Sequence, residues 1–193
     1  MLHRSPDSVP PQPEAVLIPT RNRPDELARA VRSIANTNRV DRLLIIIVDA
    51  SDSSQAELNQ SILDSRLDLP VLYLRFPGSP AGTRQRNYGL KHCPASVSVI
   101  HFLDDDVKVH HKYFDEIASA FQANPDAGGI GGQIIEPNSH RAARPAWTQH
   151  LFLLDSPTIG AVLPSGHVSH HPCNGDIHPV QWLSTCASSY RRV

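Results

Sequence analysis

Three consecutive carboxylates follow an apolar segment in the middle of the chain, and their types and spacing suggest chemistry. The run from Val97 to Leu103 leads directly into Asp104, Asp105 and Asp106. Such a run predicts a buried strand, and open α/β sheets bind ligands at the carboxyl ends of their strands. If the strand conformation continues, Asp104 and Asp106 share a face and Asp105 does not. Two carboxylates so close together favour a hard cation, Mg²⁺ or Mn²⁺, shared with phosphate oxygens.

An alternative interpretation of the same stretch is an acidic turn that caps the following helix, and the stretch alone does not decide between the two. The composition describes an ordinary globular protein of about one domain, with 193 residues, 40% hydrophobic residues and a formal net charge of -1. Nothing in it indicates a nucleic-acid partner. No apolar stretch reaches the about 18 residues that a membrane span needs. Three cysteines are too few for a disulfide framework, so we expect a cytoplasmic protein.

The remaining sequence predicts strands that alternate with helices, which is typical of an α/β fold with a mostly parallel sheet. Apolar runs predict strands at 15–18, 43–48, 71–74 and 133–135 and a short strand at about 180–183. Apolar residues at helical spacing predict helices at about 24–36, 58–63, 84–92 and 112–122, with Asn22 available to cap the first. We expect a disordered leader at 1–13, an α/β domain at 14–136, and an irregular segment at 137–193.

Polar residues follow three of these predicted strands and begin one of the helices. In order they read Ile18-Pro19-Thr20-Arg21-Asn22-Arg23, Val48-Asp49-Ala50-Ser51, Thr83-Arg84-Gln85-Arg86-Asn87-Tyr88-Gly89-Leu90 and Phe102-Leu103-Asp104-Asp105-Asp106. Together, their order and spacing resemble the inverting family 2 glycosyltransferases of GT-A fold. The resemblance covers about 15–135 and, more loosely, 180–193. It implies a mixed, mostly parallel sheet flanked by helices and incomplete at its C-terminal end. It also implies that 14–136 is a nucleotide-sugar-binding domain and that 137–193 is a truncated acceptor-side segment.

The resemblance also implies a set of binding residues. The nucleotide-sugar contacts would be Pro19, Thr20, Arg21, Asn22, Asp49, Ser51, Arg84, Arg86, Asp104 and Asp105, and the metal ligands Asp106 and Asp104. Thr20 and Asp49 would hold the imide of a uracil or thymine base, although both are also common helix-capping types. Arg86 would contact the diphosphate, with Arg84 as its alternative. The cation, Mg²⁺ or Mn²⁺, would stabilise the charge on the leaving nucleoside diphosphate.

The implied reaction is transfer of a sugar from a UDP- or dTDP-sugar to a glycan or lipid-linked acceptor in polysaccharide assembly. The catalytic residue stays unknown, because the family's general base follows the position of Arg191 and Arg192 and is expected beyond Val193. The alternatives are a truncated, non-catalytic nucleotide-sugar-binding remnant and a nucleotidyltransferase, although 19–23 lacks the glycines of a phosphate loop. We expect no transmembrane segment, and peripheral membrane association stays open.

A histidine-rich segment at 167–178 is the remaining candidate for chemistry. It contains His167, His170, His171, Cys173 and His178. Zinc sites usually pair two sets of closely spaced ligands, and only one such set is present, so histidines of an acceptor loop are the favoured interpretation.

Overall fold

The computed structural model divides the chain into two compact units. The first comprises Met1–Ile130 and Thr185–Val193, and the second comprises Gly131–Ser184. The residues that the structure describes are 13–66, 69–135, 158, 160–163, 165, 168 and 177–192. Residues 1–12 of the predicted leader and most of the histidine-rich segment therefore lie outside the described residues.

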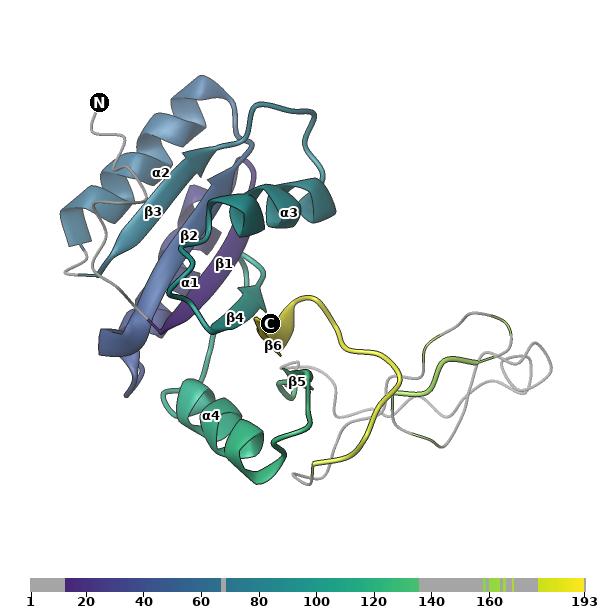
Figure 1. The fold of residues 1–193 in the computed structure, drawn as a ribbon. Coiled ribbons are helices and arrows are strands. Elements are labelled where there is room, and N and C mark those ends of the chain that lie inside the picture. The colour runs from purple at the N-terminus through teal and green to yellow at the C-terminus, as the bar shows by residue number, and fades with distance from the viewer. Residues whose placement is uncertain are drawn as a thin grey trace. The chain divides into compact units, whose positions relative to one another are not determined.

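A six-stranded sheet forms the centre of the first unit (Figure 1), in the spatial order β3-β2-β1-β4-β6-β5. The strands are β1 (Glu14–Thr20), β2 (Leu43–Asp49), β3 (Val71–Arg75), β4 (Val99–Leu103), β5 (Gly129–Gly131) and β6 (Ala187–Arg191). The strands β1 to β4 run parallel to one another, and β6 pairs antiparallel with β4. The prediction of a mixed, mostly parallel sheet is confirmed.

Helices cover both faces of this sheet. They are α1 (Pro24–Ala35), α2 (Ser53–Arg66), α3 (Gly82–His92) and α4 (Tyr113–Ala123), and a short 3-10 turn, η2 (Val40–Arg42), precedes β2. Residues of α1, α2 and α4 share one buried cluster with the sheet, and α3 packs against the other cluster. The helices predicted within these regions are confirmed as elements, with boundaries shifted by a few residues.

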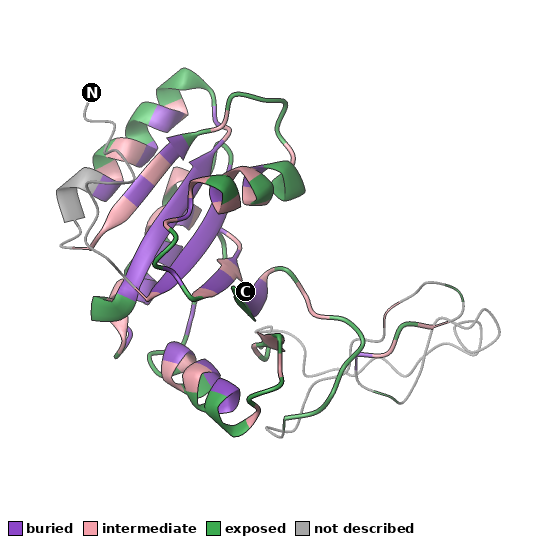
Figure 2. Ribbon diagram, viewed as in Figure 1, coloured by how far each residue is buried: buried purple, intermediate pink, exposed green. Residues whose placement is uncertain are grey.

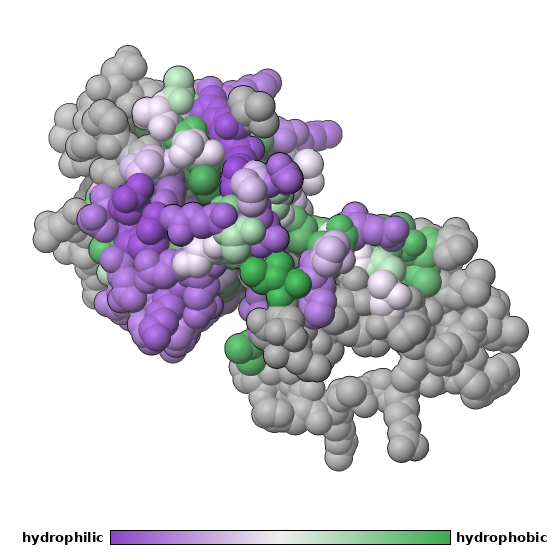
Figure 3. Space-filling view, turned by 60° about the horizontal axis from the view of Figure 1, so that its bottom comes forward, coloured by the Kyte–Doolittle hydropathy of each residue, from purple (hydrophilic) through white to green (hydrophobic). Residues whose placement is uncertain are grey.

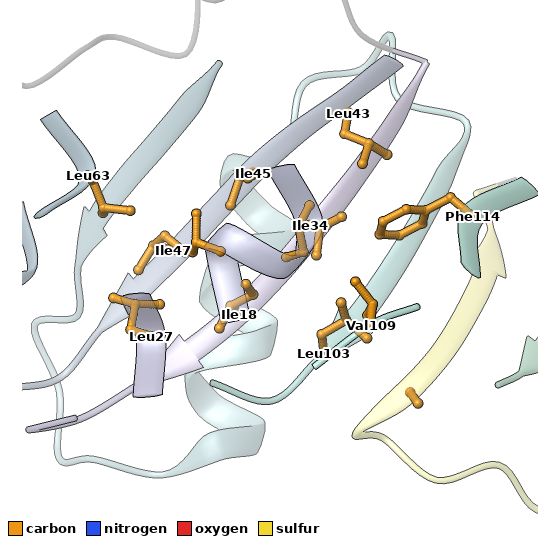
Figure 4. Close-up of a cluster of buried hydrophobic side chains, with 13 residues drawn as sticks. Ile18, Leu27, Ile34, Leu43, Ile45, Ile47, Leu63, Leu103, Val109 and Phe114 are labelled. Atoms are coloured by element: carbon orange, nitrogen blue, oxygen red, sulfur yellow. The ribbon is translucent and has the colours of Figure 1, made fainter. Parts of the chain in front are cut away.

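The strands β1 and β2 are mostly apolar on both faces, which is why their sequences are continuous hydrophobic runs. Every residue of β2 is buried, as Figure 2 shows. Leu43, Ile45 and Ile47 point to the face covered by α1, where they pack with Ile34 (Figure 4), and the alternate residues face α3. This alternation assigns each residue at a strand end to one side of the sheet.

Close approach of α3 to the sheet depends on Gly89. A Cβ added there would lie 2.6 Å from Leu17 Cδ1 and 2.9 Å from Val48 Cγ2. A larger residue would push the helix outward, so this glycine of the Arg-Asn-Tyr-Gly motif sets the distance between α3 and the carboxyl ends of β1 and β2.

Two strand predictions near the C-terminal part of the chain are wrong. The strand expected at 133–135 lies at Gly129–Gly131 instead, and residues 180–183 form no strand. The chain enters the sheet later, as β6, where Ala187 and two serines are buried beside β4. Small side chains suit the crowded position between β4 and β5, and they leave no apolar pattern in the sequence.

The surface of the first unit is mainly polar. Hydrophilic residues dominate the part of it that Figure 3 shows, and Leu58 and Tyr190 are its exposed large hydrophobic residues among those described. None of the helices in the described ranges combines the length and the apolar character that crossing a bilayer requires.

Candidate nucleotide-diphosphate site

The polar residues singled out in the sequence gather at the carboxyl edge of β1, β2 and β4. Parallel pairing brings Thr20 at the end of β1 beside Asp49 at the end of β2, and β4 ends immediately before the three carboxylates. The helix α3 starts near the same edge and brings Arg86 to it. The sheet topology therefore joins four motifs that are far apart in the sequence.

The three carboxylates lie in a turn that follows β4 and not on an extended strand. The strand β4 ends at Leu103, the chain turns at Asp105 and Asp106, and Val107 N donates to Asp104 O at 3.3 Å. The expectation that Asp104 and Asp106 share a face apart from Asp105 is therefore wrong, because strand alternation stops before them.

Asp105 is the buried member of the three. Its side chain is 9% exposed, and its Oδ2 accepts a hydrogen bond of 2.7 Å from Thr20 Oγ1. Its Oδ1 lies 3.3 Å from Arg23 Nη1, and the same nitrogen lies 3.1 Å from Asp106 Oδ2. Arg23 thus bridges Asp105 and Asp106, and Thr20 does not cap the first helix.

Asp104 pairs with a different arginine, because Arg86 of α3 donates to its Oδ1. The guanidinium is largely buried, and its Nε has no hydrogen-bond partner among the described residues. Burial raises the pKa of Asp104, and the nearby charges of Asp106 and Asp105 raise it further, against the opposing effect of Arg86. The three carboxylates therefore form one electrostatically coupled cluster, which we call the acidic tip.

Asp49 is fully buried at the end of β2 and already has several donors. Its Oδ1 accepts from Ser51 N at 2.7 Å, and its Oδ2 accepts from Asn59 Nδ2 at 2.9 Å and from the Tyr73 hydroxyl. Arg75 Nη1 lies 3.5 Å from the same oxygen. Burial and the Asp49 charge raise the pKa of Tyr73, which keeps this hydroxyl protonated as a donor. Asp49 therefore fixes the loop that follows β2, and a base would reach it only if one of these donors moved.

The loops after β1 and β2 are joined by Asn22. Its backbone N donates to Ser51 Oγ at 2.7 Å, and its Oδ1 accepts from Asp52 N at 3.0 Å. Asn22 has a φ of 53°, a left-handed conformation that asparagine tolerates better than most residues. The expectation that Asn22 caps α1 is wrong, because α1 has no side-chain cap; Asp52 accepts from Gln55 N at the start of α2.

Gln85 ties the first turn of α3 to both strand ends. Its buried side-chain Nε2 donates to Thr20 O and to Val48 O, at 2.9 Å each. Arg84, one residue earlier, is exposed, as is Arg21 in the loop after β1, while Pro19 of β1 is partly exposed. The structure therefore favours Arg86 over Arg84 as the arginine beside the acidic tip.

Several residues of this edge were not assigned from the sequence. Arg23 and Gln85 lie inside the four motifs but were given no role, whereas Asn59, Tyr73 and Arg75 belong to no motif. The signal for Arg23 was its place at the end of the first motif, directly beside the assigned residues. Contacts such as Asn59 with Asp49, ten residues apart, depend on how α2 packs against the sheet.

The donor atoms of the acidic tip fit an Mg²⁺- or Mn²⁺-type cation only in part. Over the described ranges, no group of three His, Cys, Asp or Glu side chains is placed to hold a metal ion. Mg²⁺ sites that serve phosphates typically use one or two carboxylates and complete the shell with substrate and water oxygens. Asp104 and the 57% exposed Asp106 are compatible with that smaller ligand set.

A known protein family matches most of the chain. The profile of glycosyl transferase family 2 matches residues 15–173, which include all four motifs. No curated protein sequence matches the chain significantly.

Solved structures with the same fold are similar over part or most of the chain. A mannosyltransferase from Pyrobaculum calidifontis, in complex with GDP-Man and Mn²⁺, superposes with a TM-score of 0.62 at 15% identity, over 95% of this chain and 47% of that one. Residues 1-349 of S. aureus TarS give 0.55 at 15% identity, over 65% and 36%. The TarS complex with UDP-GlcNAc gives 0.51 at 17% identity, over 64% and 36%. The chain thus has the GT-A fold and spans less than half of these proteins.

Proposed function

Because the chain belongs to glycosyl transferase family 2, we propose that it transfers a sugar from a nucleoside-diphosphate donor to a glycan or lipid-linked acceptor, with inversion. The observation that supports this proposal is the gathering of Thr20, Arg86 and the acidic tip at one carboxyl edge of the sheet. Ligands of open α/β sheets bind at such edges. The process would be polysaccharide assembly, in the cytoplasm or at a membrane surface.

The proposed donor site places the diphosphate between the acidic tip and α3. Arg86 would bind a phosphate oxygen, and its Nε, beside Asp104, is a donor without a hydrogen-bond partner among the described residues. Asp106 and Asp104 would hold Mg²⁺ or Mn²⁺, which offsets the charge that develops on the leaving diphosphate. The exposed Asp106 can rotate toward a ligand, whereas Asp105 is fixed by Thr20.

The nucleotide base would lie over the loops after β1 and β2. We favour uridine or thymidine, as the family resemblance implies, with Thr20, Arg21 and Asn22 on one side and Ser51 on the other. Asp49 is buried and accepts from Ser51 N, which supports a role in holding the loop after β2 in place. It would contact the base only after one of its donors moved.

A non-catalytic nucleotide-sugar-binding protein is the second candidate. Such a protein would bind the nucleotide sugar without supplying the general base that an inverting transferase needs. A turnover assay on the 193-residue chain separates the candidates. Release of nucleoside diphosphate from UDP- or dTDP-sugars, with or without acceptor, is expected only of a catalytic protein.

Calorimetric titration with nucleoside diphosphates tests the donor site itself. We expect UDP or dTDP to bind in the presence of Mn²⁺, and the Asp106→Ala variant to lose the Mn²⁺-dependent part of that binding. Asp126→Ala, which removes an exposed carboxylate after α4, serves as the control and should bind as the wild type. Equal binding by Asp106→Ala and the wild type, with and without Mn²⁺, would contradict the proposed site.

A further inference from the structure

We propose that Arg23 holds Asp106, one of the two proposed ligands of the cation, in the free protein and then serves as a donor-positioning residue. In this proposal, which rests on the proposed function, the cation displaces Arg23 from Asp106, and the released guanidinium binds a phosphate oxygen of the donor. No bond to carbon or phosphorus is made or broken in this exchange. Only ion pairs change partners.

The geometry of Arg23 is that of a substitute for a cation. A single nitrogen, Nη1, lies 3.3 Å from Asp105 Oδ1 and 3.1 Å from Asp106 Oδ2, so one positive group is shared by two carboxylates. A divalent ion at the acidic tip would compete for Asp106 Oδ2. Binding of the cation therefore requires Arg23 to give up this contact.

The two carboxylates that Arg23 bridges differ in how firmly they are held. Asp105 is 9% exposed and accepts a hydrogen bond from Thr20, so it keeps its position. Asp106 is 57% exposed, and its ion-pair partner is Arg23. Exchange at Asp106 therefore leaves Arg23 tethered to Asp105, within the site and close to the bound cation.

Charge balance explains where the released guanidinium goes. Before a ligand binds, the three carboxylates of the acidic tip and the guanidinium groups of Arg23 and Arg86 together carry a net charge of minus one. A divalent cation reverses the sign of this charge. A diphosphate then compensates it, and arginine binds phosphate oxygens well because its planar fork presents paired donors.

Arg23 and Arg86 differ in their freedom to move. The Arg86 side chain is 16% exposed and lies against Asp104, whereas the Arg23 side chain is 53% exposed. Exchange of partners is therefore easier for Arg23. Arg86 would stay in place as a preformed phosphate contact.

The proposal predicts effects of opposite sign for Arg23→Gln in two calorimetric titrations. Mn²⁺ alone should bind several-fold more tightly, because its competitor is gone. UDP in the presence of saturating Mn²⁺ should bind at least about tenfold more weakly, as expected for the loss of a charge-assisted hydrogen bond. If dTDP binds the wild type more tightly than UDP, it replaces UDP as the probe.

Two further variants separate a direct contact from general charge and folding effects. Arg29→Gln removes the same charge from α1, at an arginine paired with Glu26, and should change neither affinity. Arg23→Lys keeps the charge but not the planar fork, and should shift both affinities in the directions of Arg23→Gln by smaller factors. Thermal unfolding monitored by circular dichroism checks that each variant is folded.

The outcomes distinguish this proposal from the proposed function. If the wild type does not bind Mn²⁺ and a nucleoside diphosphate, the donor site itself is wrong. If the wild type binds both and Arg23→Gln leaves either affinity unchanged, or weakens both, the exchange is overturned. The same holds if Arg29→Gln reproduces the shifts or Arg23→Lys binds as the wild type.

Discussion

At the residue scale, three neighbouring aspartates have three different environments. Asp105 is buried and fixed by Thr20, Asp104 is partly exposed and paired with Arg86, and Asp106 is exposed. Identical side chains in consecutive positions can therefore have different burial and different partners. The turn after Leu103 produces this division, because it directs the three carboxylates to different partners.

The raised pKa of Asp104 predicts a pH-dependent gain in stability for Asp104→Asn. Burial and the neighbouring carboxylates disfavour the charged form in the folded protein, against the effect of Arg86. A carboxyl group whose folded pKa lies above its unfolded value of 3.8 destabilises the fold at neutral pH. We therefore expect Asp104→Asn to unfold at a higher temperature than the wild type at neutral pH. This advantage should shrink as the pH falls through the raised pKa and vanish below the unfolded value.

Asp104→Asn should also lose Mn²⁺-dependent binding of nucleoside diphosphate. This loss would distinguish a residue that binds the cation from one that acts only on stability. Thermal unfolding by differential scanning calorimetry, at several pH values, measures the first effect, and titration calorimetry measures the second. A variant less stable than the wild type at neutral pH would show that the Arg86 ion pair outweighs burial.

The sequence predicted which residues gather at this edge of the sheet better than it predicted their arrangement. Motif positions placed Thr20, Arg86 and Asp106 at one edge because parallel strands present their carboxyl ends together. The direction of the Asp104 side chain could not be predicted, because side chains alternate between faces only within a strand and β4 ends at Leu103. The place of Arg23 within the first motif gave no indication that its side chain reaches across to the chain after β4.

At the element scale, α3 sets the geometry of the site. Gly89 allows the helix to approach β1 and β2, Gln85 binds the carbonyl groups of both strands, and Arg86 lies one residue further, at the acidic tip. The motif of α3, which was predicted to bind phosphate, thus also contains the residues that hold this helix against the sheet. The residue that positions the helix and the proposed phosphate-binding residue are thus adjacent in the sequence.

Gln85→Leu should destabilise the fold and weaken diphosphate binding together. The substitution removes the side-chain donor from Thr20 O and Val48 O, although Thr20 O still accepts from Ala50 N at 3.0 Å. Each lost hydrogen bond is expected to destabilise by about 0.5–1.5 kcal/mol. Urea denaturation measures the first effect, and calorimetric titration with UDP and Mn²⁺ measures the second. Gln122→Leu, at an exposed position of α4, is the matched control and should change neither. Unchanged stability of Gln85→Leu would show that water replaces the side-chain donor.

The elements that the sequence predicted well were those with long apolar runs. The strands β1, β2 and β3 and the apolar stretch of β4 were recognisable because both faces of the sheet are covered. The strand β6 was not, because its buried residues are Ala187, Ser188 and Ser189. Its place in the sheet is decided by pairing with β4, a contact over nearly ninety positions of sequence that local pattern does not encode.

At the scale of the whole molecule, a buried polar row crosses the sheet away from the proposed donor site. His101 on β4 lies between Glu14 on β1, with Nε2 3.3 Å from Glu14 Oε2, and Ser189 on β6, with Nδ1 2.7 Å from Ser189 Oγ. Burial lowers the pKa of His101, so the imidazole is neutral, able to donate to Glu14 and accept from Ser189. Arg39 also donates to Glu14. The row therefore joins three strands of the sheet that presents the acidic tip.

This row predicts how the stability of the whole fold depends on pH. Burial tends to raise the pKa of Glu14, but hydrogen bonds from His101 and Arg39 outweigh it, so the folded pKa lies below the ordinary value of 4.5. The ionised carboxylate thus stabilises the fold above pH 4.5, and this contribution is lost as the pH falls through the lowered pKa. We expect Glu14→Gln to lower the free energy of unfolding by about 1–3 kcal/mol at neutral pH, as for buried hydrogen bonds to charged groups.

The difference between wild type and Glu14→Gln should decrease at acidic pH, where both side chains are neutral. Urea denaturation at a series of pH values measures it, and Glu57→Gln, at an exposed position of α2, serves as the control. A difference that stays constant with pH would mean that Glu14 acts through packing alone. A difference that follows the predicted course would show that an ion pair at the amino end of β1 stabilises the sheet whose opposite edge carries the proposed donor site.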